Sequence, residues 1–325
     1  MAKSPLFVVP VDFAQEMEAT VSAAVALAKK WEARVHLLEV VAPSRLHDDR
    51  AELRKSRRAT SKGDWSRLED AIHVAEQGQV DLRIVAYRGD AIKIIASYAQ
   101  LTEASLLVID QHYGTARWRR STRVVSTLSR GAPAPVLVLP PRRRSEKTKP
   151  LSFAHIVSAV DFTVASAVAL RTVLRLIRRT GARLTLVHAL KALQPMTFSG
   201  GEGVRVARNW KGNAASAAKQ FRRKIPADVA IRVDTRVTTG DPHYGILDTA
   251  TDVKADLIVM GVAPRMRFDE MLSGSTLRSV LRRTKIPVLV VPVPAGAHEW
   301  LEEADAVVVA SATRRAGKPK RLPAR

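Results

Sequence analysis

The 325-residue chain contains the same series of features twice, and this repeat restricts its fold more than any other feature. The apolar run Phe7–Phe13, which contains Asp12, returns 149 residues later as Ile156–Phe162, which contains Asp161. The Pro-Val-Leu-Val segment within 134–140 returns within 286–292. A repeat of roughly 150 residues has the length of one domain, so the chain is expected to form two units of the same fold.

This repeat predicts four regions along the chain. A first domain is expected at 1–141 and a second at 151–294. Between them lies a basic linker, 142–150, that ends in proline. The last region, 295–325, begins with acidic residues and ends in a tail rich in Arg, Lys and Pro, a composition typical of disorder.

Within each copy, short apolar runs alternate with segments whose apolar residues have helical spacing. In the second copy such a helix is expected to end at Gly181, before the strand Leu184–Leu190; its apolar positions are Val168, Leu170, Val173, Leu174 and Ile177. Continuously apolar strands separated by amphipathic helices indicate a parallel sheet covered on both faces. We therefore expect an α/β protein with two tandem doubly wound parallel five-stranded sheets.

The composition excludes several kinds of catalytic and metal-binding site. The chain contains no cysteine, which excludes disulfide frameworks, thiolate nucleophiles, iron–sulfur clusters and thiolate zinc sites. It has neither a basic start followed by a signal-peptide core nor 18 consecutive apolar residues, so we expect a cytoplasmic protein without a transmembrane segment. Of the net charge of +22, the second domain carries +12, whereas the first carries only +4.

A candidate phosphate loop occurs only in the second copy. The strand Leu257–Met260 is followed by Gly261, and thirteen residues later Gly274-Ser275-Thr276 opens a helix. Glycine allows close backbone approach, and the free N–H groups at a helix start attract phosphate. The plainer interpretation, which the residues alone leave open, is that Gly261 forms a turn and Ser275 caps the helix.

Taken together, three features resemble the universal stress protein family: the Asp after the first strand, the loop Gly-x2-Pro-x9-Gly-Ser-Thr and the closing Ile-Pro-Val-Leu-Val-Val strand. The resemblance covers 5–140 and 153–293 and implies the adenine nucleotide alpha hydrolase-like fold. The family loop has a second glycine where this chain has Pro264. Proline lacks an N–H and has a fixed φ, so one donor is missing from the loop.

The resemblance also implies that the second domain binds ATP or a related adenine nucleotide, with a bridging divalent cation, Mg²⁺. Adenine and ribose would face Asp161 and the backbone near Ala159 and Val160, and Val187 would contact the base. The sugar and phosphates would lie against five further residues: Met260, Gly261, Gly274, Ser275 and Thr276. Such a protein is expected to act in stress-response signalling as a binding protein, and its last strands to pair in a dimer or between the two repeats.

The first copy departs from the family pattern. Asp110, Tyr113 and Thr122-Arg123 stand where the glycines are expected. Because a carboxylate repels phosphate and bulky residues prevent close backbone approach, this copy is expected to have lost nucleotide binding. The cluster of arginines at 117–123 would hold a different anion or a nucleic-acid backbone, or form an exposed basic helix start.

Two alternatives to nucleotide signalling remain. The basic linker and tail would bind nucleic acid or an acidic protein, with affinity that falls steeply with salt. Slow ATP hydrolysis or phosphotransfer is the other. Neither a Gly-x-Ser-x-Gly elbow nor a Walker lysine motif is present, and the eight histidines have no metal-ligand spacing, so a binding protein is expected rather than an enzyme.

Overall fold

The computed structural model describes most of both repeats. The described residues are 4–11, 18–41, 72–73, 75–111, 113, 125, 127–129, 131–140, 151–190, 223, 225–230, 232–263 and 275–293. The predicted linker, the loop 264–274, the arginine cluster at 117–123 and the C-terminal segment lie outside them. Within the described part, no helix is both long enough and apolar enough to cross a bilayer.

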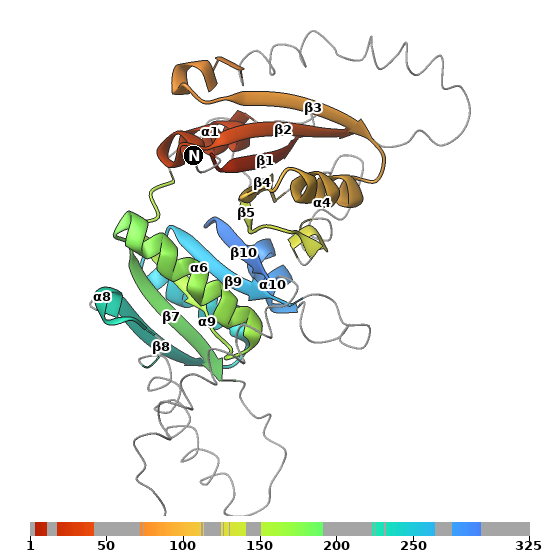
Figure 1. Ribbon diagram of the computed structural model, residues 1–325. Coiled ribbons are helices and arrows are strands. Elements are labelled where there is room, and N and C mark those ends of the chain that lie inside the picture. The colour runs from red at the N-terminus through yellow and green to blue at the C-terminus, as the bar shows by residue number, and fades with distance from the viewer. Residues whose placement is uncertain are drawn as a thin grey trace, which may run out of the picture.

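Both repeats contain strands and helices in the expected order (Figure 1). The elements of the first are β1 (Leu6–Val11), α1 (Glu18–Trp31), β2 (Arg34–Val41), β3 (Leu82–Arg88), α4 (Ala91–Leu101), β4 (Leu106–Asp110) and β5 (Val136–Leu139). Those of the second are β6 (His155–Ala159), α6 (Val164–Thr180), β7 (Arg183–Leu190), α8 (Ala227–Ala230), β8 (Val233–Thr239), α9 (Pro242–Asp252), β9 (Leu257–Val262), α10 (Ser275–Arg283) and β10 (Val288–Pro292).

The two five-stranded sheets are joined edge to edge into one sheet of ten strands. Its order is β3-β2-β1-β4-β5-β10-β9-β6-β7-β8, and all neighbours are parallel except β5 and β10. That antiparallel pair places Leu289 opposite Leu137. Pairing of the last strands, which the sequence left open between repeats and chains, is therefore made within one chain.

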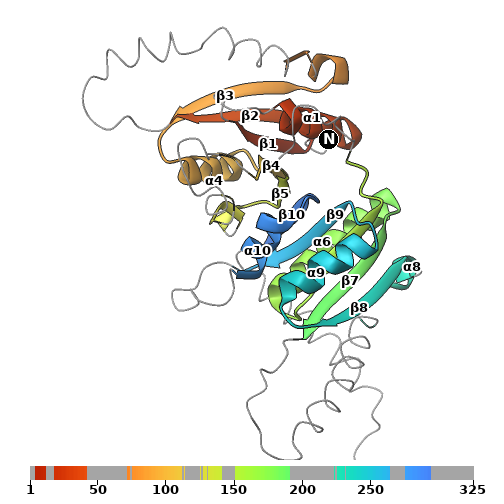
Figure 2. The same cartoon turned by 180° about the vertical axis from the view of Figure 1, so that it is seen from behind.

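Helices cover both faces of this sheet (Figures 1 and 2). Helices α1 and α6 pack on one face, against residues such as Val9 and Leu289. Helices α4, α9 and α10 pack on the other, against residues such as Val8 and Val290. Each of these two apolar clusters contains residues of both repeats, so the core is continuous across the junction.

Helix α6 shows how local sequence sets these elements. Thr163 caps its start by accepting a hydrogen bond from the Ser166 N–H at 3.4 Å. Gly181 ends it with φ 74°, a left-handed conformation that costs glycine little, and its N–H donates to the Ile177 carbonyl at 2.8 Å. The predicted helix and its stop at Gly181 are therefore confirmed.

Candidate functional site

The sheet opens between β6 and β9, where the chain reverses its direction of strand addition. From β6 the chain continues to β7 on one side, and from β9 it continues to β10 on the other. Strands β6 and β9 pair only as far as Ser158 and Val259, whereas β9 and β10 stay paired to Val262. A crevice at the carboxyl ends of strands at such a reversal is where ligands bind in open α/β sheets.

On the β6 side of this crevice, Asp161 is the exposed group. The Val160 N–H donates to the Val187 carbonyl at 2.9 Å, and the Val160 carbonyl accepts from His188 Nδ1 at 2.6 Å, so this backbone is already used. Asp161 Oδ1 accepts from both the N–H and the hydroxyl of Thr163, at 3.0 and 2.6 Å. Within the described residues both of these bonds go to Oδ1, which leaves Oδ2 available to a ligand.

An aromatic pair that the sequence did not indicate lies beside this carboxylate. The rings of Phe162 and His188 are 4.8 Å apart and tilted by 59°. Phe162 has φ 62°, a strained conformation for a residue with a side chain, and such strain collects at functional sites. The sequence feature that could have indicated this pair is the position of Phe162 directly after Asp161, together with the position of His188 near the end of the neighbouring strand.

Val187, which is expected to contact the base, does not lie at the tip of its strand. Strand β7 ends at Leu190, as the sequence predicts, so three residues follow Val187. The Val187 side chain is 1% exposed and its carbonyl is bonded to Val160. Ala189, two residues later and half-buried, lies on the same side of β7 and closer to the crevice.

On the β9 side, Gly261 has a packing role that its sequence position did not reveal. A Cβ atom at Gly261 would lie 2.0 Å from the Ala165 carbonyl oxygen and 2.4 Å from the Ala165 carbonyl carbon. Glycine is therefore needed here because the first turn of α6 lies against it. The preceding residue, Met260, is 5% exposed and packs in the core beneath α9 and α10.

The crevice is completed by the start of α10. This helix connects β9 to the parallel β10, so its N-terminus lies at the carboxyl edge of the sheet, beside the crevice. It begins at Ser275, and Thr276 in its first turn is half-buried. Gly274 lies outside the described residues. The structure thus brings Ala159, Asp161, Gly261 and the α10 start to one edge of the sheet.

The same opening exists in the first repeat, where a carboxylate residue, Asp110, stands at the end of β4. Strands β1 and β4 pair only as far as Val8 and Leu107. Asp110, at the position of Gly261, accepts a hydrogen bond from Thr20 Oγ1 of α1 at 3.3 Å. Tyr113 is 8% exposed and its N–H donates to the Asp110 carbonyl at 3.0 Å.

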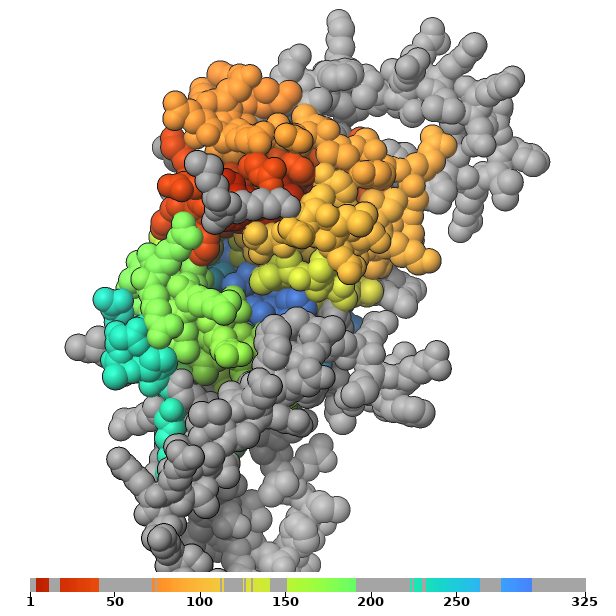
Figure 3. All heavy atoms as spheres, viewed as in Figure 1, coloured from red at the N-terminus to blue at the C-terminus, as the bar shows by residue number. Residues whose placement is uncertain are grey.

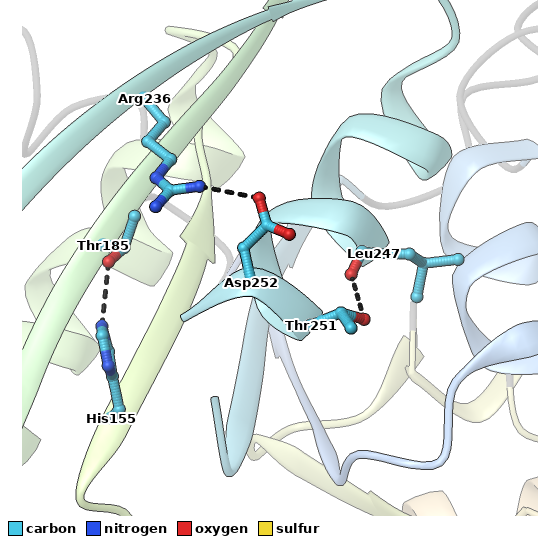
Figure 4. A network of polar contacts seen from close by, with 6 residues as sticks. All are labelled: His155, Thr185, Arg236, Leu247, Thr251 and Asp252. Atoms are coloured by element: carbon cyan, nitrogen blue, oxygen red, sulfur yellow. Dashed lines mark hydrogen bonds and ion pairs between the residues drawn. The ribbon is translucent and has the colours of Figure 1, made fainter. Parts of the chain in front are cut away.

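Other polar contacts of the second repeat hold the fold together (Figure 4). His155 Nε2 lies 2.9 Å from the Thr185 hydroxyl between β6 and β7, and burial lowers the pKa of this histidine. Arg236 Nη1 donates to Asp252 Oδ2 at 3.0 Å and ties β8 to the end of α9. Among the described residues, no group of three or more His, Asp or Glu side chains is placed to hold a metal ion.

The two repeats with their crevices define a class of doubly wound α/β ligand-binding domains. The model of the universal stress protein family matches 7–140 and 152–292, so the chain belongs to this family. The fold resembles a universal stress protein from Archaeoglobus fulgidus with a TM-score of 0.62 and 18% identity, over 89% of this chain and 97% of that one. A protein of unknown function from Pseudomonas aeruginosa, PA1789, gives a TM-score of 0.58 and 17% identity, over 93% and 97%.

A curated relative shares more sequence over a shorter stretch. Universal stress protein MJ0531 from Methanocaldococcus jannaschii is 33% identical over 72 residues, which are 22% of this chain and 42% of the relative. The match therefore spans less than half of that protein.

Proposed function

We propose that the second repeat binds ATP or a related adenine nucleotide in the crevice between β6 and β9. The observation that supports this proposal is the Asp161 carboxylate, which is held by Thr163 through one oxygen and has its other oxygen available at the edge of the sheet where α10 begins. A fixed carboxylate accepts hydrogen bonds from the two hydroxyls of a ribose. The α10 N-terminus offers N–H groups and the positive end of a helix dipole to the phosphates.

The surroundings of the site suit an anion with an apolar base. From Thr276 onward, every exposed residue of α10 is basic: Arg278, Arg282 and Arg283. Ala159 and Ala189, both half-buried, provide an apolar surface at the ends of β6 and β7. Mg²⁺ would be held mainly by the nucleotide phosphates, as is usual for this ion, because the described residues form no metal cage. Nucleotide occupancy would then serve as a stress-response signal.

Calorimetric titration with Mg²⁺–ATP tests the proposal. Asp161→Asn retains an oxygen that accepts from Thr163 but loses the charge offered to ribose. Losing a charge-assisted hydrogen bond costs about 1.5–3 kcal/mol, so we expect Kd to rise by about 10-fold or more.

Asp241→Asn is the matched control for this experiment. Asp241 is also exposed and also precedes a helix, but it follows β8 and its side chain makes no capping hydrogen bond. Its substitution should change Kd less than about twofold. Equal effects of the two substitutions, or no binding by the parent protein at millimolar ATP, would contradict the proposal.

The enzymatic alternative has a separate measurement. Phosphate release by the purified protein that disappears in Asp161→Asn would indicate slow hydrolysis at this site. Release that persists in this variant at the parent rate would instead come from a contaminating ATPase.

A further inference from the structure

The outer surface of α6 carries only one kind of charge. Each of its exposed residues is an arginine, namely Arg171, Arg175, Arg178 and Arg179. The helix contains no acidic residue between Val164 and Thr180. A solvated helix normally mixes both signs, because oppositely charged side chains one turn apart stabilise it. The composition of α6 therefore calls for an explanation beyond solubility.

This surface continues onto the end of α1. The Arg179 guanidinium lies over the Trp31 ring, 4.4 Å from its centroid, in a cation–π contact. Lys29 and Lys30, in the last turn of α1, are both exposed. Figure 3 looks onto this side of the molecule, with α6 in green next to the red elements of the first repeat. We call the residues Arg171, Arg175, Arg179, Lys29 and Lys30 the α6 face.

Among the described residues, few acidic side chains lie on this surface. Asp228 of α8 pairs with Arg178 through Nε at 2.8 Å and Nη2 at 3.3 Å, and this contact lowers the pKa of the carboxyl group. Arg171, Arg175 and Arg179 form no ion pair with any described residue. Glu32, next to Trp31, is the exposed acidic residue at the end of α1. The α6 face thus keeps its positive charge.

We propose that the α6 face binds the phosphate backbone of duplex nucleic acid. Arg171, Arg175 and Arg179 follow one another at four-residue intervals, so they form a row about 12 Å long on one side of the helix. A row of unpaired cations is the arrangement that neutralises successive phosphates. Contacts to phosphates carry no sequence information, so binding is expected to be independent of base sequence.

The surface suits nucleic acid better than a bilayer. A helix that binds a membrane surface inserts exposed apolar side chains beside its basic ones. No exposed position of α6 carries an apolar residue. Binding of α6 to a bilayer would therefore gain electrostatic energy but no energy from apolar insertion. Binding to a polyphosphate depends on the electrostatic energy alone.

Helix α10 provides an internal control for the charge argument. It also exposes three arginines, but it packs beside α9, which exposes Asp248 and Asp252, and Arg283 lies 5.8 Å from the centroid of the Tyr244 ring. Substituting two of its arginines removes the same charge from the opposite face of the sheet.

Fluorescence anisotropy with a labelled 20-base-pair DNA duplex, measured from 20 to 200 mM NaCl with the full chain, tests the proposal. For Arg171→Gln with Arg175→Gln we expect the slope of log K against log salt to fall by about two, since each lost phosphate contact removes about one. Affinity at 50 mM NaCl should fall at least about 10-fold. Arg278→Gln with Arg282→Gln should keep both the slope and the affinity of the parent.

Each other outcome overturns the proposal. Equal losses in the two double variants would mean that net charge alone binds DNA. An unchanged α6 variant, with binding lost on deletion of 311–325, would assign binding to the tail. Binding to vesicles with 30% anionic lipid but not to the duplex would identify a membrane surface. Asp161→Asn should bind DNA like the parent, so the outcome is independent of the nucleotide proposal.

Discussion

Replacing Gly261 with alanine tests why a glycine stands at the end of β9. The new Cβ would lie 2.0 Å from the Ala165 carbonyl oxygen and 2.9 Å from the Ser166 nitrogen. Contacts below 3.0 Å essentially never occur for a real Cβ atom, so the first turn of α6 must move by about 1 Å. That turn is held by Thr163, whose side chain and backbone bind Asp161, and by packing of Ala165 on Val293.

The expected cost follows from these contacts. Overpacking a well-packed interior typically costs about 1–3 kcal/mol. Because the clash here is with backbone atoms, which cannot rotate away as a side chain would, we expect the upper end, about 3 kcal/mol. For domains of this size that corresponds to a melting temperature about 6–12 °C lower. Thermal and urea unfolding followed by circular dichroism, without nucleotide, measure both quantities.

Gly131→Ala is the control for this substitution. A Cβ atom at Gly131 would meet nothing within 4 Å, and the residue has helical conformation, so its replacement should leave stability unchanged or raise it by up to about 1 kcal/mol. If Gly261→Ala unfolds together with the parent protein, the packing explanation is wrong and ligand approach becomes the reason for this glycine. If Gly261→Ala is destabilised, any weaker nucleotide binding by this variant follows from the moved helix and is not evidence for contacts between Gly261 and the phosphates.

Two further predictions concern buried polar groups. The Ser158 hydroxyl is buried without a hydrogen-bond partner among the described residues, so Ser158→Ala should raise the free energy of unfolding by about 1 kcal/mol. The equally buried Ser129 donates to a carbonyl at 2.7 Å, so Ser129→Ala should lower the free energy of unfolding by about the same amount. Urea unfolding that ranks the two variants the other way would refute this reasoning. Burial lowers the pKa of His36 and His155 below the ordinary 6.5, so protons bind the unfolded chain more tightly and stability is lost as pH falls below about 6.5. His36→Gln should therefore lose less stability than the parent between pH 7.5 and pH 5. Equal losses in the two proteins would contradict the assignment to His36.

The fold could be predicted because its signals are local and occur twice. The apolar runs, the helical spacing and the Gly181 stop each depend on neighbouring residues. Because the chain contains the pattern twice, each copy supports the assignment of elements in the other. Which edge β10 pairs with is a different question. The apolar sequence of β10 predicts that this strand is paired on both edges, but the same residues would pair with β5 of this chain or with a strand of another copy.

The candidate site could be predicted only in part. Asp161 and the start of α10 lie at the crevice as expected, because the end of a parallel strand and the start of the next helix always share one edge of the sheet. The role of Gly261 could not be read from the sequence, since crowding by Ala165 depends on how closely α6 approaches β9. The burial of Val187 depends on tertiary packing, since β7 ends at Leu190 as expected and Val187 is nevertheless only 1% exposed.

The junction between the repeats gives the first repeat a structural role although Asp110 stands where the second repeat has Gly261. Val288 and Val290 of β10 pair with β5, and both apolar clusters run across this pair without interruption. Without β5, β10 would be an apolar edge strand with unpaired backbone groups, which is the feature that promotes aggregation. Within this chain the first repeat therefore serves as the structural partner of the second, whatever its crevice contains. This structural role does not depend on whether glycine or Asp110 stands at the end of β4, because β5 contributes to the junction through Val136, Leu137 and Val138.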